Sequence, residues 1–178
     1  KDYFEKKLSE SLGLTRVSAP VFVDPTTGLN DNLTGVETPV SFKAPDGTNL
    51  EIVHSLAKWK RFALKEYSMS GIYTDMNAIR KNEELDNIHS IYVDQWDWES
   101  VIRKEERNVY CLKKIVEKIY SALLETEKIV NSKYKCLTNK LTPEITFITS
   151  EELLHKYPML TPQEREFNFV KEKKAVFI

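Results

Sequence analysis

Cysteine is scarce in this chain of 178 residues, which contains only Cys111 and Cys136. Their wide separation does not match the spacing of metal ligands, so free thiols in a reducing compartment are expected. Long apolar runs are absent, and the first residues do not resemble a signal peptide. We therefore expect a cytoplasmic protein without a membrane partner.

An excess of charge of either sign is missing as well. The 26 basic residues are scattered among 27 acidic ones, and the net charge is −1. No basic block stands out, so no nucleic-acid partner is expected. The composition, 41% hydrophobic and 30% charged, is that of an ordinary globular protein, and the length predicts a single domain over residues 1–178.

Apolar periodicity and turn residues predict both strands and helices. Strands are expected at residues 36–43, 50–54, 72–79, 88–97 and 145–148, and the polar stretch 23–35 is expected to be a loop. Helices are expected at residues 2–12, 56–67 and 99–134, and after the start signals Ser150 and Thr161. Hairpin-like strands followed by long helices predict an α+β fold, with a mainly antiparallel sheet flanked by helices.

The two ends indicate a longer polypeptide. The chain begins inside an amphipathic pattern, and the closing run Ala175–Ile178 is typical of the start of a buried strand. A chain that ended there would leave this strand without a neighbour. We therefore expect the domain to be truncated on its C-terminal side.

A lone arginine, Arg80, closes the predicted strand 72–79. Its guanidinium group is a planar fork that matches pairs of phosphate or carboxylate oxygens. Arg80 is therefore a candidate anion-binding residue. A surface salt bridge with Glu83 or Glu84 is an equally good interpretation.

Gln95 and Asp97 share one face of the predicted strand 88–97, whereas Trp96 and Trp98 face the other way. An ionised aspartate only accepts hydrogen bonds, and a glutamine both donates and accepts them. Together they can recognise an ammonium group such as that of a free amino acid. The alternative is a half-exposed strand with ordinary polar residues.

Two weaker candidates lie earlier in the chain. Ser55 and Lys60 lie near the start of a predicted helix, where capping and solvation of a helix face are the alternatives. His54 alone is weak evidence, since a satisfied structural histidine is commoner than a ligand. Asp31 lies in the polar loop 28–35, which has glycines at both ends and could enclose a small ligand or form an ordinary turn.

Four stretches carry a resemblance to a known family: NDNLTG (30–35), HSLAKWKR (54–61), GIYTDMNAIR (71–80) and HSIYVDQWDWE (89–99). They resemble the ammonia-dependent asparagine synthetases, the aspartate–ammonia ligase family, and the likeness covers essentially the whole chain. That family is similar to the catalytic core of class II aminoacyl-tRNA synthetases, without their anticodon-binding domain. The resemblance thus implies a partial class II core in a single catalytic domain.

The resemblance also implies a reaction and three catalytic roles. ATP would activate the side-chain carboxylate of L-aspartate as β-aspartyl-adenylate, and ammonia would then displace AMP to give L-asparagine. Arg80 matches the motif 2 arginine of class II enzymes and would bridge the aspartate carboxylate and the α-phosphate. Lys60 would add positive charge near the substrate carboxylates. Asp31 would attract ammonium and accept its proton.

The same resemblance implies the binding residues. Ser55, Gln95 and Asp97 would hold the amino-acid end of the substrate, and the Ile88 backbone and Ser90 would contact the adenylate. Magnesium would accompany ATP, with ligands in a second half of the family's chain that is not present here. The chain alone would therefore contain no metal site and show no activity.

Residues 4–22 resemble motif 1 of class II enzymes, which implies that an exposed apolar face of this segment forms a homodimer interface. Two other interpretations are an aspartyl- or asparaginyl-tRNA synthetase-like core and a non-catalytic relative that only dimerises. The near-neutral charge argues against the first. The presence of Arg80, Gln95 and Asp97 argues against the second.

Overall fold

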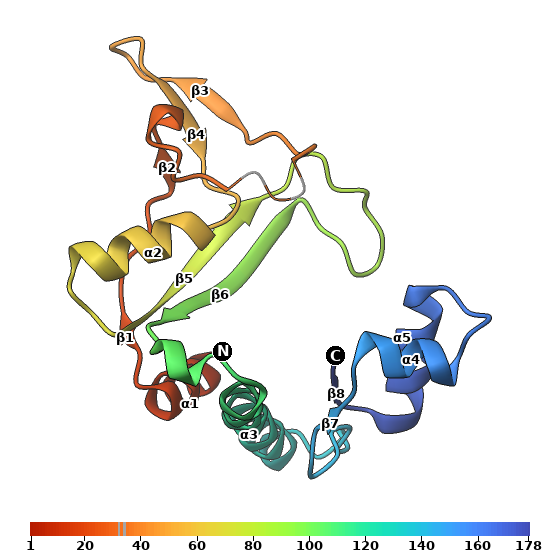
Figure 1. The fold of residues 1–178 in the computed structure, drawn as a ribbon. Helices are drawn as coiled ribbons and strands as arrows, with labels where there is room; N and C mark the ends of the chain where they lie inside the picture. Colours follow the sequence, from red (N-terminus) through yellow and green to blue (C-terminus); the bar gives the residue numbers. More distant parts are fainter. Residues whose placement is uncertain (32, 34) are drawn as a thin grey trace. The chain divides into compact units, whose positions relative to one another are not determined.

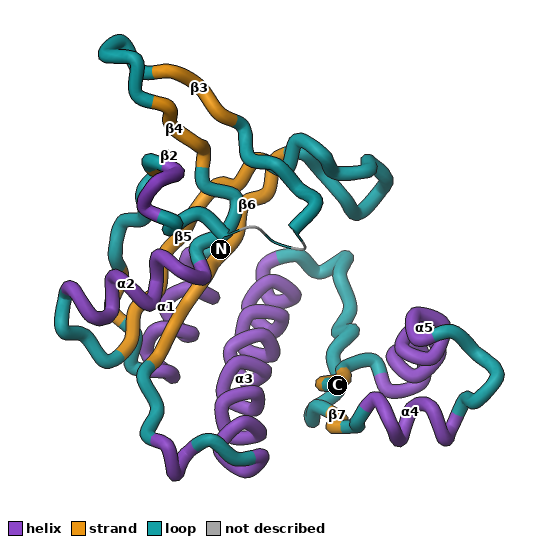
Figure 2. The backbone as a smooth tube through the Cα atoms, turned by 45° about the horizontal axis from the view of Figure 1, so that its top comes forward, coloured by secondary structure: helices purple, strands orange, loops and turns teal. Residues whose placement is uncertain are grey.

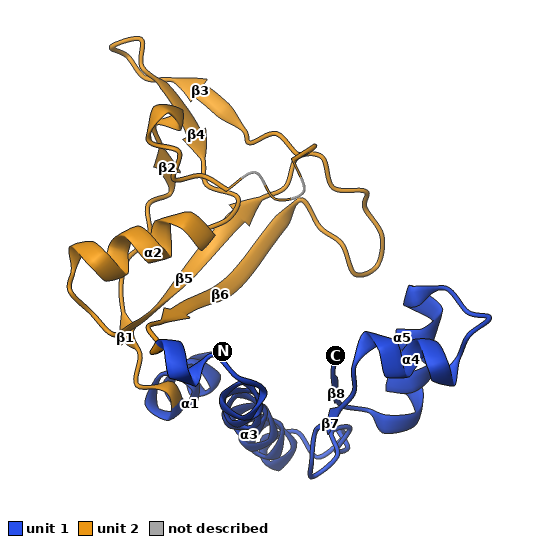
Figure 3. Cartoon of the chain, viewed as in Figure 1, with its two compact units in different colours: residues 1–11, 104–178 blue, residues 12–103 orange. Residues whose placement is uncertain are grey.

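The computed structural model describes residues 1–178 except 32 and 34 (Figure 1). The chain forms two compact units, shown in Figure 3. Residues 12–103 are named here the sheet unit, and residues 1–11 with 104–178 the helical unit. All the predicted site residues belong to the sheet unit.

The sheet unit contains two small sheets. In chain order its elements are β1 (Thr15–Arg16), β2 (Phe22–Val23), the 3₁₀ helix η1 (Pro25–Thr27), β3 (Ser41–Lys43), β4 (Asn49–Ile52), α2 (Ala57–Glu66), β5 (Gly71–Ile79) and β6 (Tyr92–Ser100). One sheet has the order β1-β5-β6, with β1 parallel to β5 and β5 antiparallel to β6. The other has the order β2-β4-β3 and is antiparallel. The mainly antiparallel arrangement predicted for the sheet is thus confirmed.

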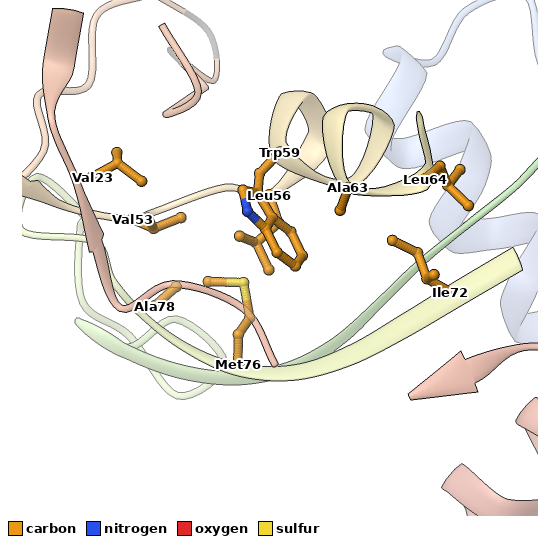
Figure 4. Packing of buried hydrophobic residues seen from close by; sticks show 9 residues of the cluster. All are labelled: Val23, Val53, Leu56, Trp59, Ala63, Leu64, Ile72, Met76 and Ala78. Atoms are coloured by element: carbon orange, nitrogen blue, oxygen red, sulfur yellow. The ribbon is translucent and has the colours of Figure 1, made fainter. Parts of the chain in front are cut away.

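The core of the sheet unit lies between α2 and one face of β5 (Figure 4). Strand β5 contributes Ile72, Met76 and Ala78, which alternate along the strand and are buried. Helix α2 contributes Trp59 and Ala63, four residues apart and therefore on one helix face. This packing holds α2 over one face of the sheet. Helix α2 therefore covers the same face of the neighbouring strand, β6.

The register of β5 and β6 brings polar side chains to the face that α2 covers. Met76 pairs with Gln95, and Thr74 pairs with Asp97. Cross-strand partners lie on the same face of a sheet, and Thr74 and Met76 are both buried on the core side. Gln95 and Asp97 therefore share the α2 side, as their alternation predicted.

The helical unit is mostly α-helix (Figure 2). Its elements are α1 (Asp2–Leu12, whose last residue adjoins the sheet unit), the 3₁₀ helix η2 (Lys104–Glu106), α3 (Val109–Lys133), β7 (Thr146–Phe147), α4 (Ser150–Lys156), α5 (Pro162–Lys173) and β8 (Val176–Phe177). Strands β7 and β8 pair in parallel. Thr149 and Thr161 cap α4 and α5 in capping boxes. The predicted start signal at Thr161 is confirmed, whereas the cap of α4 is Thr149, one residue before the predicted Ser150.

Three predicted elements differ from the structure by more than two residues at an end. The strand predicted at 36–43 is β3, which begins only at Ser41. The strand predicted at 88–97 is β6, which begins later and stays paired with β5 as far as Ser100. The helix predicted at 99–134 is shorter at its N-terminal end. Helix α3 begins after Asn108, whose Oδ1 accepts a 2.9 Å hydrogen bond from the N–H of Cys111 and caps the helix.

The apolar face of residues 4–22 is less exposed than predicted. Phe4 and Leu8 of α1 are buried. Val21 and Phe22 are exposed, Val21 by 70%. The exposed apolar face predicted for residues 4–22 is therefore found only at the end of this segment, at Val21 and Phe22.

Candidate active site

Lys60 is a buried cation on α2, with a side chain that is 8% exposed. Its Nζ donates hydrogen bonds to Oδ1 of Asp97 and, at 3.0 Å, to the backbone oxygen of Trp98, and it lies 3.6 Å from Oε2 of Glu99. A buried charge is stable only when it is paired and hydrogen-bonded, so these contacts hold the lysine and both carboxylates in place. Among the described residues two of its N–H groups make hydrogen bonds, and the third is available to Glu99 or to a further acceptor.

Glu99 is a neighbour of Lys60 that was not predicted as a site residue. It follows Asp97 by two residues and so lies on the same face of β6. Its Oε1 is also 3.7 Å from Nε of Arg61, but that arginine is largely in solvent and its charge is screened. The buried lysine balances one of the two carboxylates, so this cluster can still attract a positively charged group.

Gln95 lies on the same face of β6, two residues before Asp97. Its Nε2 donates a 3.3 Å hydrogen bond to Sδ of Met76. A thioether sulfur is a weak acceptor. A ligand with a stronger acceptor could therefore take over this amide at little cost.

Arg80 immediately follows β5, and its N–H donates a 2.8 Å hydrogen bond to the backbone oxygen of Ile91. Its Nη1 lies 3.7 Å from Oε2 of Glu83, so the salt bridge considered as the alternative is present. Its Nε is buried and has no hydrogen-bond partner among the described residues. Since a buried unpaired N–H is unfavourable, an anion at this point would satisfy a group that the described residues leave unsatisfied.

A cavity of about 100 Å³ is lined by residues that include Arg80 and His54. Thr38, which also lines it, donates hydrogen bonds of 3.1 and 3.2 Å from its N–H and Oγ1 to Oδ1 of Asn82. The cavity is smaller than a typical ligand pocket, so it does not by itself hold a nucleotide. It does place His54 and Arg80 around one space.

Asp31 is held by the segment that leads into α2. Oγ of Ser55 donates a 3.4 Å hydrogen bond to Oδ2 of Asp31, and Nζ of Lys58 lies 3.9 Å from its Oδ1. The backbone oxygen of Asp31 contacts Nε2 of His54. Oγ of Ser55 also accepts a 3.4 Å hydrogen bond from the N–H of Ala57, but the N-cap position of α2 is Leu56, so Ser55 is not the capping residue considered as the alternative.

The loop between β5 and β6 is organised around one carboxylate oxygen. Oδ1 of Asp86 accepts hydrogen bonds from the N–H groups of Ile88 (2.8 Å) and His89 (2.7 Å) and lies 2.8 Å from Nδ1 of His89. Oγ of Ser90 accepts a 3.3 Å hydrogen bond from the N–H of Tyr92. Because the N–H of Ile88 is engaged, a contact from its backbone to a nucleotide would come from the carbonyl group.

The Asp86–His89 pair predicts a pH dependence of this loop. The hydrogen bond to Asp86 raises the pKa of His89, and the N–H of Ile88 and the His89 ring lower the pKa of Asp86. A raised histidine pKa stabilises the loop at low pH, and this contribution is lost as the pH rises through the raised value. The Asp86 contribution is lost as the pH falls through its own lowered pKa, so the charged pair exists between the two.

We therefore expect the substitution Asp86→Asn to lower the pKa of His89, because the carboxylate that favours the imidazolium is removed. A titration of the imidazole resonances by NMR measures this shift, with the exposed His155 of α4 as the internal reference. An unchanged His89 titration in the variant would mean that the pair does not form in solution.

Outside residues 32 and 34, the chain has no group of three or more His, Cys, Asp or Glu side chains that could hold a metal ion. No helix in the described part of the chain is both long and apolar enough to cross a membrane.

The structure joins some of the predicted site residues directly. Contacts link Lys60 to Asp97 and Ser55 to Asp31. Four further predicted residues make the contacts described above with residues that were not predicted as site residues. They are Arg80, Ile88, Ser90 and Gln95. Asn30 and His54 were not among the predicted site residues, although both hold Asp31 or its neighbours. Their buried positions had no signal in the sequence beyond the polar character of the loop.

The fold of the chain is similar to part of two asparaginyl-tRNA synthetases. The enzyme from Pyrococcus horikoshii, complexed with asparaginyl-adenylate, superposes with a TM-score of 0.66 over 88% of this chain and 36% of that chain, at 15% sequence identity. The Entamoeba histolytica enzyme gives a TM-score of 0.62 over 96% of this chain and 38% of that chain, at 12% identity. The fold is therefore a partial class II aminoacyl-tRNA synthetase-like core, as the sequence predicted.

Sequence comparison narrows this class to one family. The family model described as aspartate-ammonia ligase matches residues 1–178. The aspartate–ammonia ligases of Fusobacterium nucleatum and Ruminiclostridium cellulolyticum are 58% and 57% identical over the whole chain, which covers 55% and 54% of their lengths. The chain belongs to the aspartate–ammonia ligase family, and it spans about half the length of the curated relatives it matches.

Proposed function

We propose that the polypeptide containing these residues makes L-asparagine from L-aspartate, ammonia and ATP through β-aspartyl-adenylate, releasing AMP and pyrophosphate. One observation carries this proposal: Lys60, Gln95 and Asp97 share the α2 side of the sheet whose strand β5 leads into Arg80. Membership of the aspartate–ammonia ligase family supports it. Because the chain spans about half the length of its relatives, residues 1–178 alone would supply part of a site and no turnover.

Arg80 would act in the first step. A β-carboxylate oxygen of aspartate attacks the α-phosphorus of ATP, and the bond from that phosphorus to pyrophosphate breaks. Both reacting groups are anions, so the step needs neutralisation of charge more than proton transfer. The guanidinium of Arg80, with its buried Nε unpaired among the described residues, can bridge a carboxylate and a phosphate oxygen.

Gln95 and Asp97 would hold the ammonium group of aspartate, and Ser55 would lie near the same end of the substrate. The Lys60 N–H that makes no hydrogen bond within the described residues would point to a substrate carboxylate. Arg80 lies four residues beyond the partner of Gln95, about 13 Å along the strand. An aspartyl group and the long arginine side chain together can span that separation.

Asp31 would act in the second step. Ammonia attacks the carbonyl carbon of the adenylate, and the bond to AMP breaks. Ammonium is the dominant form of ammonia in neutral water, and only the neutral molecule is a nucleophile. A carboxylate that attracts ammonium and accepts its proton would supply that nucleophile where it is needed. The Asp31 carboxylate is partly exposed, which suits this exchange of ligands.

Ile88 and Ser90 would contact the adenylate from the loop between β5 and β6. Magnesium would accompany ATP, but the described residues contain no cluster of carboxylates suited to it. We propose, from the family resemblance, that its ligands lie outside residues 1–178. We further propose a cytoplasmic homodimer, with the exposed Val21 and Phe22 near its interface.

The proposal is tested by product analysis with a full-length enzyme containing this sequence. We expect asparagine, AMP and pyrophosphate in equal amounts from aspartate, ATP and ammonium, without any tRNA. Formation of ADP would overturn the adenylate route. A gel shift with tRNA would instead favour a synthetase-like function.

A further inference from the structure

Two buried polar side chains lie directly beside Asp31. Asn30 is 7% exposed and His54 is 3% exposed. Buried polar groups are retained where their hydrogen bonds are satisfied, and removing one partner leaves the other unsatisfied. The contacts of these two residues therefore indicate what they hold in place.

Asn30 ties its loop to the end of β4. Its Nδ2 donates hydrogen bonds of 3.2 Å to Oε2 of Glu51 and to the backbone oxygen of Ile52. Its Oδ1 accepts a 3.2 Å hydrogen bond from the N–H of His54. Both donors and the acceptor of the amide are thus used, which fixes the backbone on the N-terminal side of Asp31.

His54 fixes the next peptide group. Its Nε2 contacts the backbone oxygen of Asp31. A carbonyl oxygen only accepts, so the ring must carry its hydrogen on Nε2, a tautomer assigned here from its partner. The ring also lines the cavity that Arg80 shares. His54 is thereby placed between the loop of Asp31 and the end of β5.

The Asp31 carboxylate is held differently from its backbone. Its side chain is 31% exposed, and its contacts with Ser55 and Lys58 are long, at 3.4 and 3.9 Å. The backbone is thus anchored by buried groups, while the carboxylate is partly exposed. Such a division suits a group that must stay in position and still exchange its ligand.

We propose that His54 is a positioning residue for the ammonia-dependent step, acting through Asp31. This inference rests on the proposed function and adds a residue to it. Without the Nε2–H donor, the Asp31 carbonyl would lose its buried partner and the carboxylate would no longer be held where ammonia attacks. The step that forms the adenylate does not use Asp31 and would proceed.

The test uses the full-length enzyme and two separate measurements. Aspartate-dependent exchange of pyrophosphate into ATP reports adenylate formation, and ammonium-dependent asparagine synthesis reports the second step. We expect His54→Phe to raise the KM for ammonium or lower the amidation rate at least about tenfold, and to change the exchange less than about twofold. His54→Gln places an amide N–H near the position of Nε2 and should restore amidation.

Two controls separate positioning from a general structural effect. His155→Phe in the exposed helix α4 should change neither measurement. In an Asp31→Ala background, His54→Phe should cause no further loss of amidation, because a residue that acts through Asp31 has nothing left to position. If His54→Phe does not fold, His54→Asn replaces it, since that amide is too short to reach the carbonyl.

Equal losses of exchange and amidation in the His54 variants would overturn the proposal, as would full amidation in a folded His54→Phe or His54→Asn enzyme. Additive losses with Asp31→Ala would also contradict it. If the wild-type enzyme itself shows no pyrophosphate exchange, the proposed function fails, and this outcome is distinct from any result with the His54 variants.

Discussion

Replacement of Arg80 by alanine is expected to lower aspartate-dependent pyrophosphate exchange in the full-length enzyme by roughly 10²- to 10³-fold. The attacking carboxylate and the α-phosphate repel each other, and Arg80 is the cation at the end of β5 whose Nε is buried without a partner among the described residues. Its salt bridge with Glu83, at 3.7 Å, is too long to occupy the guanidinium fully. Loss of the side chain therefore removes charge stabilisation and leaves the fold intact.

Arg80→Lys separates charge from geometry. A lysine keeps the positive charge but lacks the planar fork, so we expect an intermediate rate. Arg107→Ala, an exposed arginine of the helical unit, serves as the matched control and should leave exchange unchanged. Exchange that persists in Arg80→Ala at the wild-type rate would remove this residue from the mechanism.

Replacement of Asp31 by alanine is expected to spare pyrophosphate exchange and to lower asparagine formation by roughly 10²- to 10⁴-fold, the range of general base catalysis. The difference arises because the carboxylate is needed to collect ammonium and remove its proton, whereas adenylate formation involves no ammonia. Asp31→Asn keeps the shape without the charge and should behave similarly.

Asp46→Ala is the matched control for Asp31, since Asp46 lies in an exposed turn of the same unit and accepts a hydrogen bond from the N–H of nearby Thr48. It should alter neither step. If Asp31→Ala reduced exchange and amidation equally, the carboxylate would have a structural role and no special part in handling ammonia.

The face of β6 that forms the site could be predicted because strand geometry is local. Alternation alone places Gln95 and Asp97 together, and the observed register with Met76 and Thr74 agrees with it. Alternation along the strand also places Glu99, two residues beyond Asp97, on this face. That residue was missed because the strand was predicted to end at 97, whereas pairing with β5 continues to Ser100.

The partners of Lys60 and Asp31 could not be predicted, because they depend on contacts between distant segments. Lys60 meets Asp97 across 37 residues of chain, and its pairing with carboxylates appears only when α2 packs on the sheet. His54 reaches the backbone of Asp31 across 23 residues. Composition and periodicity report local conformation, so neither the path of loop 28–35 nor its buried anchors follow from them.

The start of α3 illustrates the same limit on a smaller scale. A helix was predicted from residue 99 onward. Residues 99 and 100 instead belong to strand β6, because they pair with β5. Asn108 then provides the cap at which the helix begins. Tertiary pairing and one side-chain hydrogen bond thus outweigh the periodic pattern at this boundary.

The proposed mechanism activates aspartate by joining its β-carboxylate to the α-phosphate of ATP. Aspartate labelled with ¹⁸O in both β-carboxylate oxygens tests it most directly, with mass spectrometry of the nucleotide and the amide after turnover by the full-length enzyme. The adenylate route predicts one ¹⁸O atom in the phosphate of AMP and one in the amide oxygen of asparagine. Unlabelled AMP, with the label in inorganic phosphate, would contradict it.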